Sequence, residues 1–160
     1  MADGMLIDRP PEGRLDGQRH LFPLRVYYED TDAGGIVYHA AYLRFAERAR
    51  TEMMRLAGLG HEDLAARHGV RLAVHRCAIE YHRPARLDDA LVIESRIAAA
   101  SGASFTIEQR VQRPPPADQA DDRDGFINLA TLTLRLVVLD HQLRPARLPG
   151  ALRAVLSPNL

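Results

Sequence analysis

The hydrophobic positions of this chain follow two different periods. Between residues 42 and 56, apolar side chains recur every three or four positions, which predicts an amphipathic helix with one apolar stripe. Gly58 and Gly60 follow this segment, and glycine is typical of a helix C-terminus. Residues 61–68 predict a shorter second helix, which Gly69 ends. The stripe consists of Tyr42, Phe45, Ala46, Ala49, Met53 and Leu56.

The other apolar runs are short and typical of strands. In residues 104–112, apolar and polar side chains alternate, which indicates one buried face and one face in contact with water. The small residues 99–103 before this run predict a hairpin. A strand, a long helix and four more strands predict an α+β fold, an antiparallel sheet with one segregated helix. The predicted strands are residues 22–28, 70–81, 91–98, 104–112 and 126–139.

Two segments lack either period. Residues 1–20 are charged and lack the apolar segment of a signal peptide, so we expect a flexible tail. Residues 113–125 (RPPPADQADDRDG) are rich in proline and aspartate, cannot pair inside a sheet, and predict a solvated loop. We therefore expect one folded domain over residues 21–155. A single helix covers only one sheet face, so we expect a second subunit on the other and at least a dimer.

Composition narrows the classes of function. The 160 residues carry a net charge of +0, no tryptophan and no basic stripe, so we expect no nucleic-acid partner. No apolar run approaches the roughly 18 residues of a membrane helix, so we expect no membrane insertion. All 21 basic residues are arginine, which excludes a lysine Schiff base. Cys77 is the only cysteine, which favours a reducing, cytoplasmic location, and its strand-like surroundings predict a buried, inert thiol.

The stretch YYEDTDAGGIVYHAAY, residues 27–42, holds the most informative chemistry. Asp32 stands in a glycine-bearing turn seven residues before His39, where the long helix is expected to begin. The first turn of a helix has unpaired N–H groups and a partial positive charge, so it would polarise a thioester carbonyl aimed at it. A carboxylate opposite could attack that carbonyl or take a proton from water. Asp30 and Asp32 are also common capping and turn residues, so the pattern alone leaves both interpretations open.

The segment YYEDTDAGGIVYHAAYLRFAERARTEM closely resembles the opening of the hot-dog-fold acyl-CoA thioesterases. The resemblance is to the 4-hydroxybenzoyl-CoA thioesterase family, and within it to the branch associated with the Tol-Pal cell-envelope system. A second signature of the family matches IEYHRPARLDD, residues 79–89, and the resemblance extends over roughly residues 24–148. It implies a long helix wrapped by a five-stranded antiparallel sheet. It also implies homodimers or homotetramers with the active site at the dimer interface. The tail and the loop at 113–125 look longer than the family norm.

The resemblance implies hydrolysis of acyl-CoA thioesters to free acid and CoA. Asp32 matches the catalytic carboxylate, as nucleophile or general base, and His39 matches the histidine whose N–H polarises the carbonyl. The imidazole of His39 could also assist the water or the leaving group. Glu47 is a reserve candidate, because another hot-dog branch uses a helix glutamate. Expected contacts with the substrate are Gly34, Gly35, Val37, Tyr38 and Tyr42, and expected contacts with its CoA part are Arg83, Arg86, Ser101, Gly102 and Ser104.

Two other functions stay open at this point. One is a hot-dog dehydratase acting on 3-hydroxyacyl thioesters, although the order of acid and histidine is one we associate with hydrolysis. The other is a non-catalytic acyl-thioester binding protein. None of the seven histidines forms a close ligand pair with an added carboxylate, so we predict no metal and no cofactor beyond the CoA of the substrate. The residues do not determine acyl length, aromatic or aliphatic preference, or a CoA or acyl-carrier-protein substrate.

Overall fold

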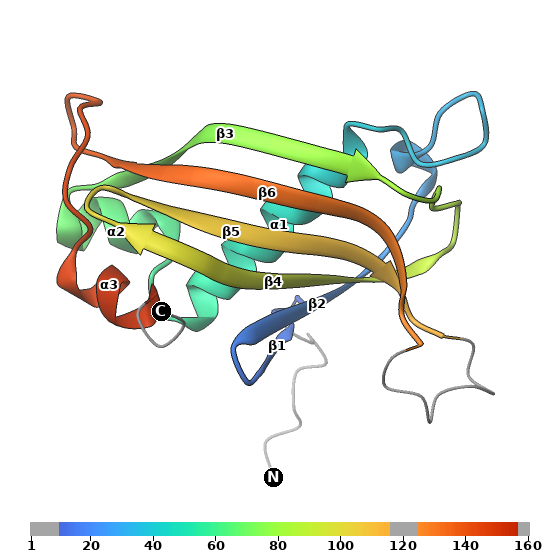
Figure 1. Ribbon diagram of the computed structural model, residues 1–160, viewed down its shortest axis with the longest axis horizontal. Coiled ribbons are helices and arrows are strands. Elements are labelled where there is room, and N and C mark those ends of the chain that lie inside the picture. The colour runs from blue at the N-terminus through green and yellow to red at the C-terminus, as the bar shows by residue number, and fades with distance from the viewer. Residues whose placement is uncertain (1–9, 116–124, 157–160) are drawn as a thin grey trace, which may run out of the picture.

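The computed structural model describes residues 10–115 and 125–156. Within these residues, the long helix α1 (Ala41–Leu56) lies against one face of a six-stranded antiparallel sheet (Figure 1). The sheet order is β1-β2-β4-β5-β6-β3. The strands are β1 (Arg14–Asp16), β2 (Arg19–Arg25), β3 (Arg71–Tyr81), β4 (Ala90–Ser101), β5 (Ser104–Arg113) and β6 (Ile127–Leu139). The shorter helices are the 3-10 helix η1 (Tyr28–Asp30), α2 (His61–His68) and α3 (Gly150–Leu156).

The apolar stripe of α1 forms the centre of the core, as the three- and four-residue period predicts. Phe45, Ala46 and Ala49 are fully buried, and α1 packs on β2, β4 and β5. Small alanines on this stripe let the helix approach the sheet closely. The helix ends where Gly58 takes a φ of +71°, a left-handed conformation that glycine adopts without steric cost.

Alternation sets which face of the central strands meets the helix. Ile107 and Val111 of β5 and Leu132 and Leu134 of β6 are buried, while the intervening side chains are mostly exposed or half-buried. The predicted hairpin between β4 and β5 is present, with Ser101 paired to Ser104. The antiparallel sheet with one long helix is therefore confirmed.

The predicted flexible tail is wrong for residues 14–20. β1 and β2 form a hairpin that turns at Gly17, whose φ is +61°, and β1 adds a sixth strand to the five expected. His20 is buried at the inward position of β2, and its Nε2 lies 2.8 Å from the Glu12 carbonyl oxygen. The strand begins at Arg19 and not at Phe22. The prediction missed this start because a polar residue at an inward position interrupts the alternation of apolar and polar side chains. Residues 1–9 and most of the predicted loop, 116–124, lie outside the described residues.

The predicted burial of Cys77 is also wrong. β3 is the strand at the far edge of the sheet, beyond the part that α1 covers, and Cys77 is exposed. α3 was not expected either; it buries Leu152 and Leu156. In the described part of the chain, no helix is long and apolar enough to span a membrane.

Candidate active site

The loop between η1 and α1 is held in a tight turn. Thr31 and Val37 form an isolated antiparallel bridge, and the Asp32 N–H donates to the Ile36 carbonyl at 2.9 Å. The Gly35 N–H donates a hydrogen bond to the Asp32 carbonyl at 3.0 Å, and Gly35 has a φ of +75°. These bonds leave little freedom to the backbone on either side of Asp32.

The Asp32 side chain is exposed at the tip of this turn. Its Oδ1 accepts a hydrogen bond from the Gly34 N–H at 2.8 Å, while no other bond to its carboxylate is found among the described residues. A carboxylate held through one oxygen keeps lone pairs of the other oxygen for a ligand. The turn therefore orients Asp32 without burying it.

Asp30, two residues earlier, has a different environment. It is 1% exposed, its Oδ2 accepts from the Tyr27 N–H at 2.9 Å, and its carbonyl accepts from the Tyr38 N–H at 2.8 Å. Arg44 on α1 lies 3.8 Å from Oδ1. Asp30 thus holds the loop to the helix, which confirms its interpretation as a turn-capping residue.

The N-terminus of α1 opens toward the same side. Ala40 is the N-cap and no side chain caps the helix. The Ala41 and Leu43 N–H groups bond to Tyr38 and Ala40, whereas those of His39 and Ala40 have no acceptor in the part of the chain that the structure describes. Free N–H groups at a helix start attract a negative charge or a carbonyl oxygen.

Tyrosines from two elements fix the far wall of this site. The Tyr81 hydroxyl, at the end of β3, donates to the His39 carbonyl at 2.8 Å. The Tyr42 hydroxyl accepts from the buried Ala85 N–H at 2.9 Å, and the Ala85 carbonyl accepts from the Val37 N–H at 2.9 Å. Burial raises the pKa of Tyr42 and also that of Tyr81. Both hydroxyls therefore stay neutral at physiological pH. The loop, the helix start and the segment after β3 are therefore tied together.

These elements enclose a cleft of about 430 Å³. Four residues of its lining were not expected from the sequence. Ile36 lies in the stretch that carries Asp32 and His39, and the signal for Tyr81, His82 and Pro84 was the IEYHRPARLDD segment. The lining residues are Asp32, Ile36, Val37, His39, Tyr42, Tyr81, His82, Arg83 and Pro84. The structure thus brings five of the candidate residues to one cleft: Asp32, Val37, His39, Tyr42 and Arg83.

The other candidates lie around or away from this cleft. Gly34 and Gly35 form the turn beside Asp32, and the ring of the exposed Tyr38 lies 4.4 Å from that of His39. Arg86 is exposed in the turn before β4, where its N–H donates to Asp89.

The β4–β5 turn lies at the opposite end of the sheet (Figure 1). Along β6, the partner of Tyr81 and the partner of Ser104 are seven residues apart, which is about 23 Å. Ser104 is buried and its hydroxyl accepts from the Arg135 guanidinium at 3.1 Å. Within one chain, Ser101, Gly102 and Ser104 are therefore not brought to the Asp32 cleft.

Glu47, the reserve candidate, lies on α1 outside the cleft and forms an ion pair with Arg50. The described residues contain no group of three or more His, Cys, Asp or Glu that could hold a metal ion. The absence of a metal stays a prediction.

Comparison with known proteins agrees with this fold. The family model described as the thioesterase-like superfamily matches residues 26–156, so the chain belongs to that superfamily. It is 37% identical to the acyl-CoA thioesterase YbgC of Haemophilus influenzae over 134 residues, which cover 83% of this chain and 90% of that protein.

Solved structures show the same relationship. The structure of a probable thioesterase from Bartonella henselae is 34% identical, with a TM-score of 0.71 over 82% of this chain and 99% of that chain. A 1,4-dihydroxy-2-naphthoyl-CoA thioesterase from Synechocystis has a TM-score of 0.74 at 21% identity, covering 87% of this chain and 96% of that chain. The second likeness supports the fold alone.

Proposed function

We propose that this protein hydrolyses acyl-CoA thioesters to a free acid and CoA, with Asp32 and the N-terminus of α1 acting on the thioester. The observation that carries the proposal is that the exposed Asp32 carboxylate and the start of α1 line one cleft. The name of the Haemophilus relative, an acyl-CoA thioesterase, supports the choice of substrate.

The chemistry follows from charge. The carbonyl oxygen gains negative charge as the thioester is attacked, and the free His39 and Ala40 N–H groups would stabilise it. One preorganised donor of this kind contributes about 3–4 kcal/mol to the lowering of the barrier. As general base, Asp32 takes a proton from water while the water oxygen bonds to the carbonyl carbon. The C–S bond then breaks, and the CoA sulfur receives the proton. As nucleophile, the Asp32 carboxylate would bond to the carbonyl carbon and expel the CoA thiolate, and water would then hydrolyse this mixed anhydride to the free acid and the Asp32 carboxylate.

Asp32→Asn tests the proposal, because asparagine keeps the oxygen that accepts from Gly34 and loses the charge. We expect thiol release from acyl-CoA to fall by about 10²–10⁴-fold with the melting temperature unchanged. Asp63→Asn, on the surface of α2, is the matched control and should keep wild-type turnover. Undiminished hydrolysis by Asp32→Asn would exclude this mechanism.

The proposal includes a homodimer, built along the free edge of β3. β3 has 11 residues and pairs only with β6 among the described strands, so its other edge presents unpaired backbone groups. Long free edges favour pairing with another strand. A second copy paired there would lie beside the cleft, since Tyr81 ends β3, and two dimers could then form a homotetramer. Light scattering that gives a monomer at micromolar concentration would contradict this arrangement.

Further parts of the proposal rest on the resemblance alone. They are the cytoplasmic location, the association with the Tol-Pal system and the absence of a cofactor other than substrate CoA. Parallel assays with acyl-CoA and acyl-carrier-protein thioesters of one acyl group would decide the carrier. Dialysis against a chelator should leave turnover unchanged, and a loss that Zn²⁺ restores would refute a metal-free mechanism.

A further inference from the structure

The helix-facing side of β3 is left largely uncovered. Cross-strand partners point to the same face of a sheet, so four residues of β3 share a face with the buried residues of β6 that they pair with. We name these four residues the β3 strip: Val74, Cys77, Ile79 and Tyr81. Val74 is 49% exposed, Tyr81 is 47% exposed and Cys77 is exposed, because α1 packs on β2, β4 and β5.

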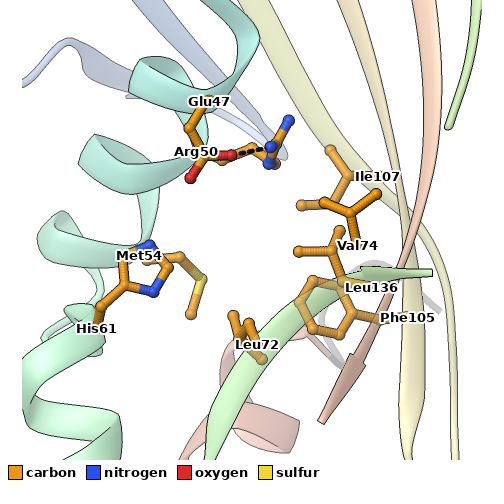
Figure 2. Close-up of a pocket in the computed structure, with 9 residues that line it drawn as sticks. All are labelled: Glu47, Arg50, Met54, His61, Leu72, Val74, Phe105, Ile107 and Leu136. Atoms are coloured by element: carbon orange, nitrogen blue, oxygen red, sulfur yellow. Dashed lines mark hydrogen bonds and ion pairs between the residues drawn. The ribbon is translucent and has the colours of Figure 1, made fainter. Parts of the chain in front are cut away.

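The β3 strip joins two hollows. Tyr81 lines the Asp32 cleft at one end. Val74 lines a second cavity of about 50 Å³ at the other end, between α1 and the sheet. Figure 2 shows Glu47, Arg50 and Met54 on the helix side of this cavity, facing the apolar side chains of the sheet. Those apolar residues are Leu72, Val74, Phe105, Ile107 and Leu136.

Arg50 is the buried charged residue of this cavity, whose lining also includes Glu47 and His61. It is 6% exposed, its Nη1 donates to Gln109 Oε1 at 2.8 Å, and its Nη2 pairs with Glu47. Gln109 is itself anchored, since its Nε2 donates to the Ala46 carbonyl at 2.9 Å and to Ser95 Oγ at 2.8 Å. The guanidinium is therefore held rigidly on the helix side of the strip.

On β3, Cys77 lies between Val74, which lines the cavity, and Tyr81, which lines the cleft. Partial burial of its sulfur raises the pKa of Cys77, and the positive charge of Arg50 opposes that rise. The same thiol adds to the raised pKa of Tyr81. Cys77 is thus an electrostatic neighbour of both Tyr81 at the cleft and Arg50 at the cavity.

The distance from the cleft to Arg50 can be estimated along the helix and along β3, where Cys77 is the electrostatic neighbour of Arg50. Arg50 pairs with Glu47, and the rise of α1 from Ala40 to Glu47 is about 10 Å. Along β3, four residues from Tyr81 to Cys77 span about 13 Å. An extended carbon chain advances about 1.25 Å per carbon, from a bond of about 1.5 Å and a near-tetrahedral angle. Both spans correspond to about eight to ten carbons.

We propose that the acyl chain of the substrate lies along the β3 strip and ends at Arg50, which makes Arg50 the residue that limits acyl length. This inference rests on the proposed function, and it names straight-chain acyl groups of up to about ten carbons as the substrate class. A longer chain would have to bring its methyl end against the Arg50–Glu47 ion pair and strip water from it, which is unfavourable. Continuity of the strip with the Asp32 cleft is what favours the acyl chain as its occupant.

Arg50→Met tests the limit, because methionine keeps an unbranched apolar side chain and removes the charge. Turnover by the wild type should rise to about eight carbons and fall beyond ten, over saturated acyl-CoA from four to sixteen carbons. In Arg50→Met, the ratio of sixteen-carbon to eight-carbon kcat/KM should increase by about tenfold or more. Arg48→Met, exposed on the same helix, is the matched control and should keep the wild-type profile. An unchanged profile in Arg50→Met, with hydrolysis that still requires Asp32, overturns this inference alone; no hydrolysis of any acyl-CoA overturns the proposed function.

A second measurement does not depend on the folding of a variant. Cys77 is the only cysteine, so N-ethylmaleimide labels one site in the wild-type protein. The probe is octyl-CoA, a thioether that cannot be hydrolysed. It should slow the labelling of Cys77 by about fivefold or more at saturation, whereas CoA alone should not, because only the octyl chain reaches the strip. Equal labelling rates with octyl-CoA and CoA would overturn the placement of the acyl chain.

Discussion

The two tyrosine hydroxyls of the cleft should differ sharply in their contribution to stability. Tyr42→Phe and Tyr81→Phe each remove one oxygen atom and keep the ring, and the two rings meet edge to face at 5.4 Å and 79°. The two hydroxyls differ in burial: Tyr42 is 2% exposed, and Tyr81 is 47% exposed.

The magnitude for Tyr42→Phe follows from its partner. The Ala85 N–H is the donor to the Tyr42 hydroxyl, and Ala85 is fully buried. Without the hydroxyl this N–H has no acceptor and no access to water, which costs about 1–3 kcal/mol. The Ala85 carbonyl also accepts from Val37, so the loop that carries Asp32 would share the disturbance.

For Tyr81→Phe, the lost bond ends on the His39 carbonyl, and water can replace the hydroxyl at this exposed position. We expect a loss of about 0.5 kcal/mol or less. Turnover should still fall, since the His39 carbonyl loses its anchor beside the helix start.

Urea unfolding of the wild type, Tyr42→Phe and Tyr81→Phe measures the difference in their free energies of unfolding. The midpoints can be compared if the three m-values are equal. The melting temperature of Tyr42→Phe should fall by about 3–9 °C and that of Tyr81→Phe by about 1–2 °C. If the two variants agree within about 0.5 kcal/mol, burial of the hydroxyl does not determine its contribution, and the reasoning is refuted.

Other predictions concern the core and the turn. Burial lowers the pKa of His20 below its usual 6.5, against the opposing bond to the Glu12 carbonyl. As pH falls, His20 is protonated in the unfolded chain before it is protonated in the folded protein. The free energy of unfolding therefore decreases as pH falls from 6.5 to the folded pKa of His20, and this loss is absent above pH 6.5. His20→Gln should flatten the fall in urea midpoint between pH 7.5 and pH 5, and an unchanged slope would contradict it. Gly35→Ala should lower stability by about 1–2 kcal/mol through its positive φ, whereas Gly34→Ala, whose Cβ would lie 3.0 Å from Asp32 Oδ1, should lower turnover more than the melting temperature. Gln109→Leu should cost about 2 kcal/mol or more in urea unfolding, because Arg50 Nη1 then loses a buried acceptor; a neutral result would mean that water replaces it.

Local pattern accounts for much of the fold and for the centre of the site. The helix from Ala41 and the alternating strands follow from periods that act over a few residues. Asp32 and His39 line the same cleft because only six residues separate them in the chain, and the glycines and aspartates of that turn determine its shape. The motif therefore indicated which residues of this loop line the cleft, but not Tyr81, His82 and Pro84, which come from the segment after β3.

Contacts between distant segments were decided by the tertiary structure. Tyr81 reaches the His39 carbonyl across 42 positions of sequence, and Arg50 meets Gln109 across 59. The exposure of Cys77 has the same origin, since it depends on which strands α1 covers.

The hairpin at Arg14–Asp16 was missed because the buried side of β2 carries a histidine, so hydrophobicity does not mark it. A period in the sequence tells which face of an element is apolar. Which neighbour that face meets depends on packing of the whole chain, and this packing alone determines the cleft wall and the Arg50 cavity.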